Sequence, residues 1–121
     1  MLKKLPSVSV IGTDDEGLRH YIYERPKVFA MFTSDACPRC ELFDVAFTKL
    51  ADEAQAQAQA IMFIRLDSDE NPVARRLMAE RAAPFFVSYC QGRMLECGTC
   101  ETEPELQSHW ARLRAFVPPV R

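Results

Sequence analysis

Apolar residues occur along the chain in two spacings, one typical of buried strands and one typical of amphipathic helices. Two runs are almost wholly apolar, as in strands covered on both faces, and they span Lys27–Thr33 and Ile61–Leu66. A shorter run over Ser7–Ile11 also favours a strand. We expect Lys27–Thr33 to lie at the centre of a sheet, because nearly all of its side chains are apolar.

Each of these strands is followed by a segment with helical features. The first helix is predicted after the capping residues Thr13–Asp15, and it ends at Pro26, which lacks a backbone N–H. The second extends from residue 38 to about residue 59, and the third starts at Asn71-Pro72. The core face of the second helix is formed by Phe43, Phe47, Leu50 and Ala54.

The C-terminal third of the chain changes to a β-hairpin followed by one helix. A strand over Pro84–Cys90, a turn at Gln91-Gly92 and a returning strand over Arg93–Glu96 form the predicted hairpin. Thr102 and Glu105 have the spacing of a capping box at the start of the last helix. One face of that helix carries Leu106, Trp110, Leu113 and Val117.

The order of these elements predicts the fold class. Strands and helices follow one another as β-α-β-α-β-α-β-β-α, which implies parallel strands joined by right-handed crossovers and an antiparallel hairpin at one edge. The expected architecture is therefore α/β, with a central mixed sheet flanked by helices. A length of 121 residues without an internal linker predicts a single domain over residues 1–121.

Charge and hydropathy exclude two classes of partner. Fifteen Lys and Arg residues against seventeen Asp and Glu residues give a net charge of −2, so no global positive field attracts nucleic acid or anionic lipid. The longest apolar stretches, such as Val28–Phe32, are far shorter than the roughly 20 residues of a membrane-spanning helix. Polar residues interrupt the segment after Lys3 and Lys4, which argues against a secretory signal. We expect a cytoplasmic protein.

The five cysteines form two C-x-x-C pairs and leave Cys90, which we interpret as a small apolar strand residue. In a reducing compartment such pairs suggest redox chemistry or metal binding. Cys37-Pro38-Arg39-Cys40 follows the predicted central strand and opens the long helix. A thiolate there faces unpaired backbone N–H groups and the positive end of the helix dipole, which favour it. We assign Cys37 as the nucleophile and the more shielded Cys40 as the resolving thiol, while Arg39 adds a positive charge.

With this motif the chain resembles the thioredoxin-like superfamily. The resemblance rests on the order of the strand, the Cys37–Cys40 motif, Asp69 with Asn71-Pro72, and Ala83-Pro84 before a strand that turns at Gly92. It implies a thioredoxin-like fold and thiol–disulfide exchange. It also implies that Pro84 is cis and lies beside Cys37, and that the backbone of Ala83 pairs with a substrate strand.

The chain departs from the thioredoxin pattern at several positions. By the resemblance, Ala36 replaces a tryptophan, Met31 replaces a buried acid, and Arg65 replaces a lysine. Without the buried acid, the proton of Cys40 would have to go to water, the backbone or a substrate group. Pro38-Arg39 in place of Gly-Pro alters the redox poise.

The second pair, Cys97 and Cys100, lies between the predicted last strand and the capping box. Three functional interpretations are open: an electron relay to Cys37 and Cys40, a four-thiolate zinc site, and a second disulfide that protects the first. The alternative is a pair of exposed turn thiols without a shared role. His20 and His109 are interpreted as residues of helix surfaces, and Trp110 as a core residue.

The main functional hypothesis is thiol–disulfide exchange by a thioredoxin-like oxidoreductase. Its substrates would be protein or peptide disulfides that dock beside Ala83, Pro84 and Arg39, and a separate reductase or small thiol would recycle it. This cycle requires a redox-active disulfide and no organic cofactor. The competing hypotheses are a non-enzymatic adaptor with the same fold and a zinc-stabilised scaffold.

Overall fold

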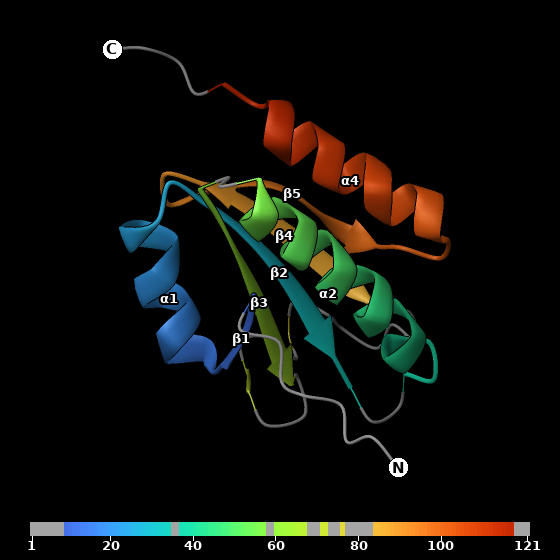
Figure 1. The fold of residues 1–121 in the computed structure, drawn as a ribbon. Helices are drawn as coiled ribbons and strands as arrows, with labels where there is room; N and C mark the ends of the chain where they lie inside the picture. Colours follow the sequence, from blue (N-terminus) through green and yellow to red (C-terminus); the bar gives the residue numbers. More distant parts are fainter. Residues whose placement is uncertain are drawn as a thin grey trace.

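The computed structural model describes residues 9–34, 37–57, 60–67, 71–72, 76 and 84–117. Figure 1 shows helices packed against a central sheet. The elements are β1 (Val10–Thr13), α1 (Asp15–Glu24), β2 (Lys27–Thr33), α2 (Cys40–Ala56), β3 (Ile61–Asp67), β4 (Phe85–Cys90), β5 (Arg93–Thr99) and α4 (Glu103–Ala115). Of the helix predicted to start at Asn71-Pro72, only residues 71, 72 and 76 lie within the described part, and residues 7 and 8 of the first predicted strand lie outside it.

The sheet has five strands in the order β1-β3-β2-β4-β5. β3 pairs in parallel with β1 and β2, whereas β4 pairs antiparallel with β2 and β5. The prediction of a mixed sheet with an edge hairpin and with Lys27–Thr33 at its centre is therefore confirmed. The parallel pairing brings the ends of β2 and β3 to the same edge, where the Cys37–Cys40 motif begins.

Local signals in the sequence account for where the helices begin and end. The side chain of Asp14 caps α1 by accepting a hydrogen bond of 2.8 Å from the Gly17 N–H. The predicted capping box of Thr102 and Glu105 is present at the start of α4. At the other end of α4, Lys27 Nζ donates hydrogen bonds to the carbonyl groups of Leu113, Arg114 and Phe116. A lysine at the start of the central strand thus stabilises the C-terminal end of α4, where the helix dipole is negative.

The hydrophobic core has two parts, one on each face of the sheet. The first part lies between the sheet and the helices α2 and α4, which run alongside each other (Figure 1). It includes the predicted α2 residues and is centred on Phe29, whose ring contacts Phe47, Phe63 and Trp110. The second part includes Leu18 of α1 together with both cysteines of the Cys37–Cys40 motif.

Three expectations for the C-terminal third of the chain are wrong. His109 is buried, with 5% of its surface exposed, because Ser88 of β4 and the Phe29 ring pack against it. Val117 is 79% exposed, because α4 ends before it, at Ala115. The last strand continues to Thr99 and therefore includes Cys97. In contrast, the burial of Cys90 and Trp110 and the exposure of His20 are confirmed.

None of the helices described in the structure is both long enough and apolar enough to pass through a membrane.

Candidate active site

The Cys37–Cys40 motif forms a disulfide at the N-terminal end of α2. The two Cα atoms are 5.4 Å apart, a separation that suits a disulfide. A tight turn produces this separation, since the N–H of Cys40 donates to the carbonyl of Cys37 over 3.2 Å. α2 begins at Cys40 rather than at Pro38, so the turn belongs to the motif itself. The structure thus brings the predicted pair together. Both cysteines are 5% exposed, so the expectation that Cys40 is more shielded than Cys37 is wrong.

A cavity of about 350 Å³ lies beside the two cysteines. Besides Cys37 and Cys40 it is lined by Thr33, Ser34, Glu41, Asp44, Arg65 and Asp67. Three carboxylates and one guanidinium therefore line the space next to the disulfide. Of these charged residues, only Arg65 was predicted from the sequence to lie near the cysteines.

A polar contact in this cavity joins Asp44 of α2 to Arg65 of β3. Arg65 Nε donates to Asp44 Oδ1 over 2.7 Å, and Nη2 of the same guanidinium contacts the same oxygen. Met31, which lies beside Arg65 in the sheet, is completely buried in the apolar core. A carboxylate reaches Arg65 from the helix rather than from the neighbouring strand. The position of Asp44 near the cysteines could have been predicted from the sequence, because Asp44 follows Cys40 by four residues on one helix.

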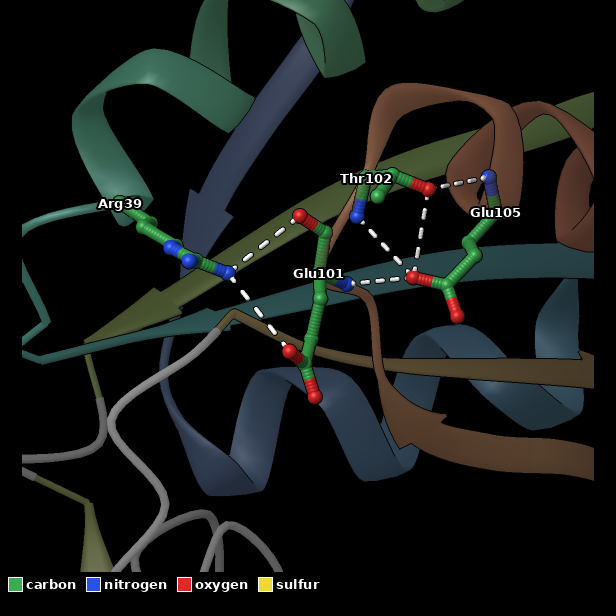
Figure 2. A network of polar contacts seen from close by, with 4 residues as sticks. All are labelled: Arg39, Glu101, Thr102 and Glu105. Carbon is green, nitrogen blue, oxygen red and sulfur yellow. Dashed lines mark hydrogen bonds and ion pairs between the residues drawn. The ribbon is translucent and has the colours of Figure 1, made fainter.

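Arg39 connects the motif to the segment before α4. Its Nη1 donates to the carbonyl oxygen of Glu101 over 3.3 Å and lies 3.9 Å from the Glu101 carboxylate (Figure 2). The N–H of Glu101 in turn donates to Glu105 Oε1 over 2.8 Å, and Glu105 also accepts from the N–H of Thr102. These hydrogen bonds with backbone N–H groups hold the pKa of Glu105 below its ordinary value. The capping box of α4 thereby holds the residue that Arg39 contacts.

Pro84 is buried, and its carbonyl accepts a hydrogen bond of 3.1 Å from the N–H of Cys100. This bond extends the pairing of β4 with β5 by one residue. Ala83 lies outside the described residues. The isomer of the Ala83–Pro84 bond and the role of Ala83 therefore stay predictions.

The second cysteine pair has a different geometry from the first. Cys97 is an exposed residue of β5, whereas Cys100 follows the strand and is buried, and both thiols are free. Three residues of extended backbone separate Cα atoms by about 10 Å, beyond the roughly 7 Å that a disulfide spans. Successive side chains of a strand also point to opposite faces, so the two sulfurs lie on different sides of the sheet. The folded structure thus does not support a disulfide between Cys97 and Cys100.

The four sulfurs do not gather at one place either. Cys37 and Cys40 belong to one part of the core, and Cys100 belongs to the other. Among the described residues, which include all four cysteines of the two pairs, no three Cys, His, Asp or Glu side chains form a group that could hold a metal ion. The structure thus does not bring the pairs together as a four-thiolate site.

Cys100 and His109 both face a second cavity, of about 460 Å³, between β5 and α4. Burial and the neighbouring carboxylate of Glu105 raise the pKa of the Cys100 thiol to about 12. Burial lowers the pKa of His109, whose Nε2 lies 3.3 Å from Ser88 Oγ and 3.6 Å from Glu96 Oε1. An uncharged thiol and an uncharged imidazole are therefore the favoured forms at this cavity near neutral pH.

Comparison with known proteins places the fold among the thioredoxins. No protein-family model matches the chain, and no curated protein matches it. Solved structures do match over nearly the whole chain. A thioredoxin mutant of Halobacterium salinarum has a TM-score of 0.72 at 19% identity, with 95% of this chain and 100% of that chain covered. Thioredoxin of Malassezia sympodialis has a TM-score of 0.74 at 19% identity, with 93% and 98% covered.

Mitochondrial thioredoxin 3 of Saccharomyces cerevisiae is similar to the same degree, with a TM-score of 0.73 at 20% identity over 88% of this chain and 98% of that chain. At such identities the likeness concerns the fold, which agrees with the resemblance found in the sequence. With its five-stranded mixed sheet and the Cys37–Cys40 disulfide at the start of α2, this chain is a protein of thioredoxin-like fold.

Proposed function

We propose that the protein catalyses thiol–disulfide exchange through Cys37 and Cys40. The observation that carries this proposal is the Cys37–Cys40 disulfide at the N-terminal end of α2. Backbone N–H groups of the first helical turn have no partner within the helix and favour a thiolate at this place. The pair can therefore alternate between a disulfide and a dithiol whose first sulfur is a good nucleophile.

The exchange proceeds in two steps. In the reduced protein, the Cys37 thiolate attacks one sulfur of a substrate disulfide, the substrate S–S bond breaks, and the second substrate sulfur leaves as a thiolate. Cys40 then loses its proton and attacks the Cys37 sulfur of the mixed disulfide, which releases the first substrate sulfur. Two electrons pass to the substrate, and the Cys37–Cys40 disulfide forms. The reverse sequence oxidises a substrate dithiol.

Protein or peptide disulfides are the proposed substrates. They would dock beside Pro84 and Arg39, with the backbone of Ala83 pairing with an extended substrate segment. A separate reductase or a low-molecular-weight thiol would return the disulfide to the dithiol, and no organic cofactor is needed for either step. The cytoplasm, where thiols are kept reduced, is the proposed compartment.

The test is trapping of a mixed disulfide. We expect Cys40→Ser to accumulate a covalent adduct with a peptide disulfide, because the resolving thiol is missing, whereas Cys37→Ser forms no adduct at position 40. Cys97→Ser is the matched control, since it removes an exposed cysteine outside the motif. Intact-mass spectrometry under non-reducing conditions measures the adducts. Binding without any adduct would instead indicate the adaptor function.

A further inference from the structure

The release of substrate requires that Cys40, which is 5% exposed, loses its proton inside the protein. Bulk water has little access to such a thiol, so a nearby acceptor would accelerate the step. We propose that Asp44 accepts the Cys40 proton and that Arg65 positions Asp44 for this role. This inference rests on the proposed exchange function and adds to it a residue outside the C-x-x-C motif.

The first argument is the position of Asp44 on α2. It follows Cys40 by four residues, and side chains at this spacing lie one above the other on the same helix face. Helical side chains also lean towards the N-terminus, which directs Asp44 towards the turn that holds Cys40. Asp44 and Cys40 accordingly line the same cavity. The Asp44 side chain is 26% exposed, so a proton that it accepts can leave to solvent.

The second argument is the contact between Asp44 and Arg65. Arg65 Nε and Nη2 both contact Asp44 Oδ1, which fixes the carboxylate at the cavity wall. Arg65 comes from β3 and is itself 35% exposed. The planar guanidinium thereby restricts where the Asp44 carboxylate can lie. Met31, next to Arg65 in the sheet, has a thioether side chain, which cannot accept the Cys40 proton.

The other charged groups at the cavity are Glu41 and Asp67. Glu41 is exposed and adjacent to Cys40 in the helix, and neighbouring positions of a helix do not face each other. Asp67 ends β3 and approaches the cavity from the sheet, so it is the rival acceptor. Asp44 is favoured because it shares a helix face with Cys40.

In the proposed step the proton moves from Cys40 Sγ to the Asp44 carboxylate, and the resulting thiolate attacks the Cys37 sulfur. A new Cys37–Cys40 bond forms as the bond between Cys37 and the substrate sulfur breaks. The electron pair leaves with the substrate thiolate. Asp44 then returns its proton to solvent or to the departing thiolate.

The experiment uses the reduced full-length protein and a symmetrical aromatic disulfide whose thiol is coloured. The parent protein and every variant carry Cys97→Ser, so that this exposed thiol outside the motif releases no colour. Rapid mixing resolves two releases of thiol, the first from attack by Cys37 and the second from attack by Cys40. In Asp44→Asn we expect the first rate to be unchanged and the second to fall about 10- to 100-fold at pH 7. The difference should narrow as the pH rises, because hydroxide can then remove the Cys40 proton without a protein acceptor.

Three further variants separate proton transfer from structure. Asp44→Glu keeps a carboxylate and should recover part of the second rate, whereas Asp52→Asn removes a similar charge from the exposed face of α2 and should leave both rates unchanged. Asp67→Asn tests the rival acceptor. The inference is overturned if Asp44→Asn leaves the second rate unchanged, if it slows that rate equally at every pH, or if Asp67→Asn alone produces the loss. Failure of the parent protein to release even the first thiol would instead refute the proposed function.

Discussion

Arg39 Nη1 lies 3.3 Å from the carbonyl oxygen of Glu101, although 62 positions separate the two residues in the sequence. Arg39 belongs to the C-x-x-C motif, and Glu101 directly precedes the capping residue Thr102 of α4. Figure 2 shows that the contact continues through Glu105 into the capping box. The start of α4 and the candidate active site are thereby joined by a short chain of hydrogen bonds.

The capping box should contribute to the stability of the fold. We expect Thr102→Ala to lower the free energy of unfolding by about 1 kcal/mol, because the N–H of Glu105 at the start of α4 loses the Thr102 hydroxyl as its acceptor. Urea unfolding followed by circular dichroism measures this change. Thr99→Ala, at the end of β5, is a control that removes a hydroxyl outside the box. An equal loss in both variants would contradict the assigned role of the box.

Arg39 itself should contribute little to stability. Its contact with the Glu101 carboxylate is long, and the two side chains are 52% and 69% exposed, so solvent screens the pair. We expect Arg39→Met to change the free energy of unfolding by less than about 0.5 kcal/mol, a smaller loss than that of Thr102→Ala. Comparison of the two variants in the same urea series tests this order, and a larger loss for Arg39→Met would show that the contact is structural.

Lys27 should contribute more to the stability of the fold than its position near a strand end suggests. Its ammonium group donates to three carbonyl oxygens at the end of α4, at 2.8, 3.1 and 2.7 Å. We expect Lys27→Met to lower the free energy of unfolding by about 2 kcal/mol, because these acceptors lose a charged donor. The exposed Lys49 on α2 supplies the control Lys49→Met, which should have little effect on the urea midpoint. Similar midpoints for the two variants would rule out this role of Lys27.

Much of this fold could be predicted from the sequence because the decisive signals are local. The apolar run of β2, the periodic phenylalanines of α2 and the capping box each lie within one element. The C-x-x-C spacing likewise specifies a contact between neighbours on a turn, and the structure forms it. Such features need no knowledge of which elements pack together.

The features that the sequence did not reveal depend on pairing between distant elements. His109 is buried because Ser88 of β4 and Phe29 of β2 cover it, and nothing within α4 indicates this. The contact of Asp44 with Arg65 likewise joins a helix to a strand. β5 extends past Glu96 because pairing with β4 overrides Gly98, a residue that normally weakens strands.

The two thiols of the second pair should react very differently. Cys97 is exposed, whereas Cys100 is buried and its thiol pKa is raised to about 12, mainly by burial. At pH 8 we expect iodoacetamide to alkylate Cys97 readily and Cys100 only after unfolding, since the thiolate is the reactive form. Peptide mapping by mass spectrometry follows both sites. A Cys97–Cys100 disulfide in mildly oxidised, folded protein would contradict the extended backbone described for this segment.

His109 should make the stability of the protein depend on pH. Burial lowers its pKa in the folded state, so the unfolded chain binds more protons below the ordinary histidine pKa of 6.5. Its contribution is therefore complete above pH 6.5 and is lost as the pH falls towards the lowered value. Glu96 opposes this shift and Arg112 adds to it.

We expect His109→Gln to reduce the fall in the urea midpoint between pH 7 and pH 5, whereas His20→Gln, on the exposed face of α1, leaves that fall unchanged. If both variants keep the wild-type pH dependence, another group must cause it, and the uncharged imidazole assigned to the cavity between β5 and α4 would be wrong.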